Sequence, residues 1–478
     1  MPALLACRFT LKDEKMDQLT QYVSSINSVL WGVYGLIPLL VGAGIYFTWR
    51  FRFVQVRHFM HAIKYVFRGV SFFGKKADKE GMSSFQSLTT AVAAQVGTGN
   101  LAGVATAIAL GGPGAIFWMW IAAFFGMATI FVEAILAQLY RTRGKDGHMI
   151  GGPAYYISQG LGSKPLAMFF SFSLIIALGC IGNMVQANSI SEAFQAAFGI
   201  PYYIVGSIVV LLAGFVFFGG VRRLASTTEK VVPFMALIYI VGGLIVILSN
   251  FSEIIPAFKM IFVGAFNPEA ATGGIIGASI KEAIRYGVAR GLFSNEAGMG
   301  STPHAHALAK VKNPVQQGLV AIIGVFIDTF VVLNITAFVI FTTGAIDGQT
   351  TGIALTQKAF TTGLGGIGMA FVAVCLFFFA FSTIIGWCFF GEQNIKYLFG
   401  SRWVNMYRMV VCCFLALGSY LHVNLVWELA DLFNGLMVLP NLLALVALSK
   451  VAEKAFREFE EEFSTGDYIT DPSKPIAD

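Results

Sequence analysis

Residues 95–100 read Gln-Val-Gly-Thr-Gly-Asn and lie inside a long apolar segment. Two glycines that flank a threonine should interrupt a helix there, because glycine is a poor helix former. In hydrocarbon, an interruption is tolerated only where the freed backbone N–H and C=O groups line a cavity within the protein. The stretch 95–100 therefore predicts a binding site in a broken helix, provided that the chain spans a membrane.

The composition indicates a membrane protein. Of 478 residues, 56% are hydrophobic and only 12% are charged, whereas about a quarter of the residues in soluble domains are charged. Repeated apolar segments of about 20 residues predict one all-α polytopic bundle. The net charge of +6 requires no nucleic-acid partner, because basic residues can gather on cytoplasmic loops.

The apolar segments predict eleven transmembrane helices. Their expected ranges are 29–50, 85–110, 114–141, 166–198, 201–219, 231–250, 275–308, 315–344, 365–396, 403–421 and 425–448. The segment 51–84 carries basic residues among Phe and Val, and we expect it to form an amphipathic helix and loop on the cytoplasmic surface.

The distribution of Lys and Arg predicts the orientation. If 51–84 is cytoplasmic and successive loops alternate between the two sides of the membrane, 24 of the 32 Lys and Arg lie on cytoplasmic segments and five lie outside. This asymmetry agrees with the positive-inside rule. The C-terminus is then cytoplasmic and the N-terminus is outside. Either Met1 or Met16 serves as the start of the chain.

Ten of the helices divide into two sets of five. Because five is odd, the second set begins on the opposite face of the membrane, as an inverted-topology repeat requires. The seventh helix opens the second set and contains a polar, glycine-rich stretch at 289–300. We therefore predict a 5+5 inverted-repeat core with two discontinuous helices and one extra N-terminal helix. The expected divisions are a periplasmic N-terminal segment (1–28), the extra helix (29–50), the amphipathic segment (51–84), the first repeat (85–250), an external connection (251–274), the second repeat (275–448) and a cytoplasmic tail (449–478).

The two interruptions resemble those of a known family. Residues 291–305, Gly-Leu-Phe-Ser-Asn-Glu-Ala-Gly-Met-Gly-Ser-Thr-Pro-His-Ala, together with Val-Gly-Thr-Gly-Asn at 96–100, are similar to the alanine or glycine:cation symporters. The first interruption also resembles that of the neurotransmitter sodium symporters, which share the five-plus-five architecture. The resemblance implies sodium-coupled import of alanine or glycine across the bacterial inner membrane by alternating access, without an organic cofactor or an obligate protein partner.

An amino acid would bind at the first interruption through its carboxylate. A half-helix that begins near Gly99 points free amides and the positive end of its dipole into the cavity. We therefore expect Thr98, Gly99 and Asn100 to contact the carboxylate of the substrate.

Three further residues are expected to surround the substrate. Phe293, at the second interruption, and Trp387, on the ninth helix, would form a wall around a small side chain, although packing is an alternative for Trp387. Gln186 belongs to a polar patch on the fourth helix, where polar side chains either bind ligands or join helices. The resemblance assigns Gln186 to the substrate.

The half-helix that ends before Gly97 leaves the carbonyls of Ala93 and Val96 without helical partners. Hard oxygen ligands suit a small hard cation. The resemblance places sodium between these carbonyls and the hydroxyls of Ser382 and Thr383. The alternative is that both hydroxyls bond back to their own helix.

Ionisable residues within the expected helices are costly and often functional. Glu133 lies about two turns before Arg141 and serves either a structural role or a gate. Glu296 either caps the start of a second half-helix or takes part in coupling. Asp328 could carry a proton, which keeps proton coupling open as an alternative to sodium.

The motifs of other protein classes are missing from the sequence. It contains neither a phosphate-binding loop followed by Lys and Ser or Thr nor an HExxH motif, so we expect neither an enzyme nor an ATP-driven pump. A channel is the competing class, but channels usually form their pore by oligomeric symmetry. The sequence does not rank alanine, glycine, serine and D-alanine, because one methylene in an apolar pocket changes binding by only about 1–3 kcal/mol.

Overall fold

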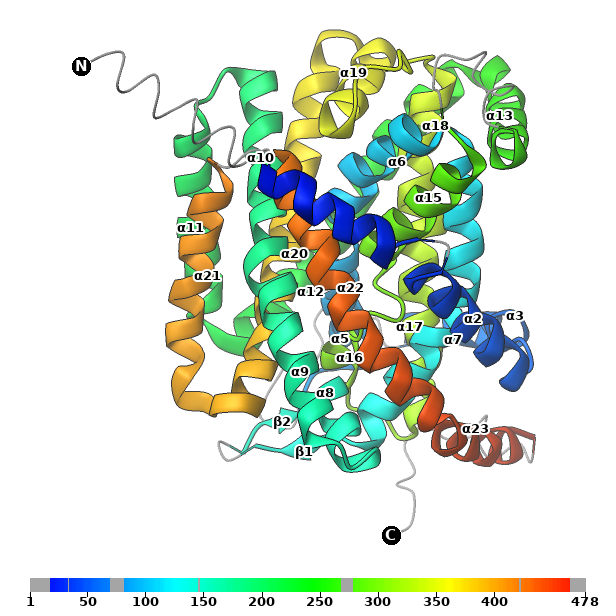
Figure 1. Cartoon of the computed structure of the whole chain (residues 1–478), viewed down its shortest axis with the longest axis vertical. Coiled ribbons are helices and arrows are strands. Elements are labelled where there is room, and N and C mark those ends of the chain that lie inside the picture. The colour runs from blue at the N-terminus through cyan, green and yellow to red at the C-terminus, as the bar shows by residue number, and fades with distance from the viewer. Residues whose placement is uncertain are drawn as a thin grey trace.

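The structure of the protein is a computed structural model, and it is almost entirely helical (Figure 1). It describes residues 18–464 except 33, 69–80, 145–146, 268–277 and 421–422. Both candidate starts of the chain, most of the expected periplasmic segment and the end of the tail lie outside the described residues.

The first half of the chain forms helices and one short hairpin. The helical elements are a helix over 18–30, α2 (Leu36–Arg50), α3 (Val54–Arg57), α4 (Phe59–Arg68), α5 (Ser84–Gln95), η1 (Gly99–Gly103), α6 (Val104–Gly111), α7 (Gly114–Leu139), α8 (Pro153–Tyr155), η2 (Tyr156–Gly160), α9 (Lys164–Leu174), η3 (Ile175–Gly182), α10 (Asn183–Phe198), α11 (Tyr202–Phe217) and α12 (Gly220–Ser249). The strands β1 (Thr142–Arg143) and β2 (Met149–Ile150) pair antiparallel between α7 and α8.

The second half is also helical. Its elements are η4 (Phe251–Glu253), α13 (Ile254–Phe266), α15 (Ile280–Asn295), α16 (Pro303–His306), α17 (Pro314–Val325), η5 (Phe326–Leu333), α18 (Asn334–Thr342), α19 (Gly352–Leu364), η6 (Gly365–Ile367), α20 (Gly368–Phe399), η7 (Ser401–Trp403), α21 (Val404–Gly418), α22 (Val423–Ala447) and α23 (Ser449–Ser464). The helices α13 and α19 occupy stretches that we expected to be connections.

Several segments are long and apolar enough to cross a membrane. Within the described ranges there are six, or seven when the bent pair Ser84–Gln95 and Gly99–Gly111 counts as one. The six are Gly114–Leu139, Lys164–Phe198, Gly220–Ser249, Pro314–Thr342, Gly352–Phe399 and Leu425–Ala447. The helices α2 and α11 are apolar but shorter, so the count of eleven stays a prediction.

The first transmembrane helix begins later than we expected. The sequence pattern predicts a helix over 29–50, but α2 begins at Leu36, and a separate helix covers 18–30. The chain turns at Gly35, where a Cβ atom would collide with the carbonyl of Leu30. A glycine is therefore needed at this close approach.

The helix α7 packs against α2, α15 and α17. Its second half is almost completely buried. The helix α10 packs along α20, while α11 and α21 run side by side at one edge (Figure 1). The helix α5 contacts both α15 and α20, and the rings of Phe293 and Trp387 link α15 to α20. These three helices carry most of the predicted site residues.

Candidate functional site

The first interruption lies between α5 and η1. The helix α5 ends at Gln95, and Val96 has an extended ψ of 91°, which takes the chain out of the helix. A π-helical turn begins at Gly99 and leads into α6, whose axis is bent by 47° from that of α5.

Backbone groups freed by this bend bond to side chains. In a continuous helix Gly97 N would donate to Ala93 O, but here it donates to Asn100 Oδ1 at 3.0 Å. Thr98 N donates to Gln186 Oε1 at 3.2 Å. Thr98 Oγ1 and Gln186 Nε2 are buried without a hydrogen-bond partner among the described residues. Because buried polar atoms are nearly always paired, these two atoms indicate a place for a polar ligand.

An aromatic wall stands next to these groups. Phe293 and Trp387 pack edge to face with ring centroids 5.7 Å apart. The ring of Trp387 covers Gly182, where a Cβ would lie 2.6 Å from it, one turn before Gln186. The indole N–H of Trp387 donates to the carboxylate of Glu296. The structure thus brings Gln186, Phe293 and Trp387 into one buried region.

Oxygen atoms from the end of α5 and from α20 converge next to Gly97. Thr383 Oγ1 lies 2.9 Å from Ala93 O and 3.4 Å from Val96 O. Ser382 Oγ lies 3.2 Å from Ala93 O. Both hydroxyls also lie close to Phe379 O, at 2.8 and 3.2 Å. Both hydroxyls therefore bond back to their own helix and also lie close to the freed carbonyls of Ala93 and Val96. The two hydroxyl oxygens and three carbonyl oxygens form a set of five oxygens that suits a small hard cation.

Asp328 joins the first interruption to α15. Its carboxylate accepts from Asn100 Nδ2 at 2.7 Å, from Ser294 Oγ at 2.9 Å and from Thr329 Oγ1 at 2.9 Å. Ser294 also faces Gly99, where a Cβ would lie 3.0 Å from Ser294 Cα. Gly99 is therefore packed against α15, so its missing side chain serves a close helix contact.

The second interruption begins later than the sequence suggested. We expected it over 289–300, but α15 continues to Asn295. Glu296 then adopts a left-handed conformation with φ 58°, and Gly298 and Gly300 also have positive φ, 92° and 78°. The left-handed conformation of Glu296 ends the helix, and the two glycines that follow adopt positive φ without the strain that other residues would have.

The carboxylate of Glu133 fills this second interruption. It accepts from Gly298 N at 3.1 Å, from Gly300 N at 2.9 Å and from Asn441 Nδ2 at 2.6 Å. Arg141, two turns further along the chain, donates instead to backbone carbonyls that follow α16. Glu133 therefore holds backbone amides and makes no contact with a basic side chain in the described part of the chain.

The interpretation that Glu296 caps the start of a second half-helix is wrong. Glu296 follows the last residue of α15, and its carboxylate accepts from Ser301 Oγ at 2.5 Å and from the indole of Trp387. It therefore binds side chains, whereas a first-turn acid would bind backbone amides. A role in coupling stays a prediction for Glu133, Glu296 and Asp328.

A buried ion pair lies next to the aromatic wall. Arg290 makes two bonds to the carboxylate of Asp431, at 2.8 and 2.6 Å. Its guanidinium lies 4.8 Å from the ring centroid of Trp427, which in turn packs on Phe293 at 5.0 Å. This pair joins α15 to α22 directly beside the predicted site.

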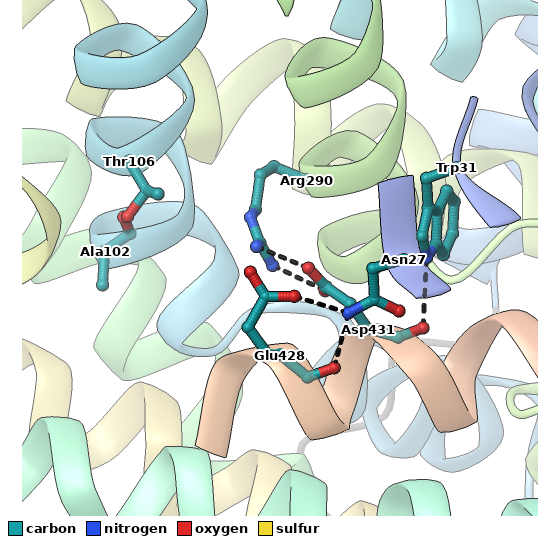
Figure 2. Close-up of polar contacts among 7 residues, drawn as sticks. All are labelled: Asn27, Trp31, Ala102, Thr106, Arg290, Glu428 and Asp431. Carbon is teal, nitrogen blue, oxygen red and sulfur yellow. Dashed lines mark hydrogen bonds and ion pairs between the residues drawn. The ribbon is translucent and has the colours of Figure 1, made fainter. Parts of the chain in front are cut away.

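The N-terminal helix covers the same ion pair (Figure 2). Trp31 Nε1 donates to Asp431 O at 3.1 Å, and Asn27 Nδ2 donates to Glu428 Oε2 at 2.6 Å. Asp431 and Asn441 are not among the residues that the sequence predicts for the site. A carboxylate and an amide inside the expected helix 425–448 were the available signal, because polar groups within a span need buried partners.

The described helices include six that are long and apolar enough to cross a membrane, as in a multi-pass membrane protein. Residues 16–472 match the model of the sodium:alanine symporter family, and the chain belongs to that family. This membership places it among symporters and not among enzymes.

Relatives and a solved structure support the assignment. The chain is 43% identical to the sodium/alanine symporter AgcS of Methanococcus maripaludis, over 92% of this chain and 97% of AgcS. It is 43% identical to the putative sodium/proton-dependent alanine carrier protein YrbD of Bacillus subtilis, over 95% of each chain. The crystal structure of MhsT in complex with L-phenylalanine is similar in fold alone, with a TM-score of 0.53 and 11% identity over 80% of this chain and 98% of MhsT.

Proposed function

We propose that the protein is a secondary symporter that imports a small neutral amino acid, alanine or glycine, together with sodium. Family membership supports symport, and the names of two relatives include alanine and sodium. The observation that carries the proposal is the position of Gly97. A Cβ on Gly97 would meet both Thr383 Oγ1, which belongs to the set of five oxygens, and Gln186 Oε1, which accepts from Thr98 N.

The substrate would bind where neutral side chains now satisfy the backbone. The carboxylate of an amino acid would accept from the amides at 97–99 in place of the oxygens of Asn100 and Gln186. A carboxylate binds such donors more strongly than a neutral amide oxygen does. The two unpartnered atoms, Thr98 Oγ1 and Gln186 Nε2, would gain partners at the same time.

Sodium would bind between α5 and α20. Its ligands would be the carbonyls of Ala93 and Val96 and the hydroxyls of Ser382 and Thr383. Bound sodium would hold the end of α5 against α20 and so fix the amides at 97–99 for the substrate. Binding of one solute thereby favours binding of the other, as coupling requires.

Transport would proceed by alternating access in a core of two inverted five-helix repeats, 85–250 and 275–448. The eleven spans, the extra helix 29–50, a cytoplasmic C-terminus and a bacterial inner-membrane location are parts of this proposal. In this orientation Arg290 and Asp431 lie on the outer side of the substrate, where their ion pair would close the outer entrance. Opening would require the pair to separate.

Uptake by purified protein in proteoliposomes tests the proposal. An inward sodium gradient should drive accumulation of radiolabelled alanine, and an inward proton gradient without sodium should not. Unlabelled alanine inside the vesicles should accelerate entry of the label, which a channel would not show. Accumulation that depends on the proton gradient alone would refute sodium coupling.

A proton-coupled carrier is the second candidate, and Asp328 is the observation that favours it. Its carboxylate is fully buried, and no ion pair to a basic side chain is recorded for it among the described residues. An uncompensated buried carboxylate is costly and binds a cation or a proton. If a proton at Asp328 drives transport, Asp328→Asn should abolish accumulation while exchange of labelled for unlabelled alanine persists.

A further inference from the structure

The second interruption is built as a receptor for a carboxylate. Positive φ values at Glu296, Gly298 and Gly300 turn the amides of the two glycines toward the same point. Successive amides in such a conformation form an anion-binding concavity. In this molecule the anion is the side chain of Glu133, which reaches the concavity from α7.

The contacts of Glu133 are complete. Its two oxygens accept from Gly298 N at 3.1 Å, from Gly300 N at 2.9 Å and from Asn441 Nδ2 at 2.6 Å. Asn441 Nδ2 also donates to Gly298 O at 2.9 Å, and its Oδ1 accepts from Tyr156. All of these side chains are buried. One carboxylate therefore joins α7, the segment 296–302 and α22.

We propose that Glu133 is the built-in carboxylate ligand of the second interruption, in the place that the carboxylate of the amino acid takes at the first. This inference rests on the proposed function. Glu133 is a positioning residue, because it acts through the backbone of 296–302 and through Asn441. It fixes the segment that carries Glu296, the partner of Trp387, and it prevents the substrate from binding at the second interruption.

The inference predicts that an external carboxylate can replace the side chain. Glu133→Ala removes a group equal in size to acetate, leaves the N–H groups of Gly298 and Gly300 without an acceptor, and takes away one of the two acceptors of Asn441 Nδ2. Unpaired buried donors are costly, so uptake of alanine should fall about tenfold or more, and the thermal unfolding temperature in detergent should also fall. Acetate at millimolar concentration should restore both. Acetamide has the same shape but offers only one acceptor oxygen and directs an N–H₂ group at the other donors, so it should restore both much less than acetate does.

Controls separate this role from general destabilisation. Asn441→Ala removes one donor but keeps the carboxylate, so it should lower uptake without any response to acetate. The wild-type protein should not respond to acetate either. Glu133→Gln offers a single acceptor oxygen and should lie between the wild type and Glu133→Ala. If Glu133→Ala does not fold without acetate, its recovery is measured by purification in the presence of acetate or acetamide.

Two readouts keep the two proposals apart. The unfolding temperature does not depend on which solute is transported, so its rise with acetate tests the carboxylate site even if alanine is not the substrate. Failure of the wild type to accumulate alanine would refute only the proposed function. Equal effects of acetate and acetamide, or wild-type uptake and unfolding temperature in Glu133→Ala alone, would overturn the inference on Glu133.

Discussion

The two interruptions satisfy their backbone amides in different ways. At the first, the acceptors are the neutral side-chain oxygens of Asn100 and Gln186. At the second, the acceptor is the carboxylate of Glu133. Hydrogen bonds to a charged acceptor are roughly twice as strong as neutral ones. An incoming carboxylate can therefore displace the neutral oxygens at the first interruption, whereas the second is already occupied.

This difference assigns separate roles to the two halves. The first interruption keeps two unpartnered polar atoms and lies next to five oxygens that suit a cation. The second has a complete network and joins three elements. The amides of the first interruption can exchange their acceptors for those of a ligand, whereas the amides of the second keep Glu133 as their acceptor.

Gly97→Ala should have the largest effect. Its Cβ would collide with Thr383 Oγ1 and would lie 3.2 Å from Gln186 Oε1, between the cation set and the substrate. Since small displacements at a site cost up to about 100-fold, alanine uptake should fall by about that factor. The matched control is Gly103→Ala, whose Cβ would have only ordinary contact with Thr98 O at 3.8 Å and should leave uptake near wild type. Equal activity of the two variants would break the comparison.

Thr383→Ala should weaken sodium selectively. It removes one of two hydroxyls that lie near Ala93 O, so the sodium concentration for half-maximal uptake should rise about tenfold, which corresponds to about 1.4 kcal/mol. Thr106 is a suitable control, because among the described residues its hydroxyl bonds only to Ala102 O, one turn earlier, at 2.8 Å (Figure 2). Thr106→Ala should leave the sodium dependence unchanged. A similar shift in both variants would show that the hydroxyl of Thr383 is merely structural.

The sequence predicted the first interruption more accurately than the second, for a physical reason. Gly97 and Gly99 are poor helix formers, and α5 ends just before them, at Gln95, as their residue type predicts. At the second, Gly291 also suggested a break, but a Cβ there would have ordinary contact with Met119, 3.4 Å away, and the helix continues. The helix ends instead at Glu296, which takes a positive φ that the residue type does not predict. Bonds to Trp387 and Ser301 hold it there.

Long-range partners could not be predicted from spacing. Glu133 and Asn441 are 308 residues apart, and Arg290 and Asp431 are 141 apart. The composition showed that each lies in an apolar segment and needs a partner, but it did not show which partner. By contrast, the proximity of Thr383 to the end of α5 was anticipated through the family resemblance.

Arg290→Lys should have a smaller effect than the site variants. Lysine keeps the charge but loses the bidentate hydrogen bonds to the carboxylate of Asp431 and the contact of the guanidinium with the ring of Trp427. Uptake should fall about fivefold through the maximal rate, because the ion pair would close the entrance without touching the substrate. Arg408→Lys weakens a similar pair with Glu392, which joins α21 to α20 and makes no hydrogen bond to a predicted site residue in the described part of the chain, and it should lower thermal stability without changing uptake. A rise in the KM for alanine instead would place Arg290 in the substrate site.

Gln186→Ala should have the smallest effect and gives the finest test of exchange at the first interruption. Gln186 Oε1 accepts from Thr98 N, and this bond would be replaced when a carboxylate binds. The variant loses the contact that Gln186 Nε2 would make with the substrate, but it also removes Gln186 Oε1, which competes with the substrate for Thr98 N. The KM for alanine should therefore rise only about threefold, the lower range of one hydrogen bond. Asn188→Ala, which loses a bond to Gly418 O at 2.9 Å, should leave the KM unchanged. A lowered KM in Gln186→Ala would show that Gln186 only competes with the substrate, and an unchanged KM would remove it from the site.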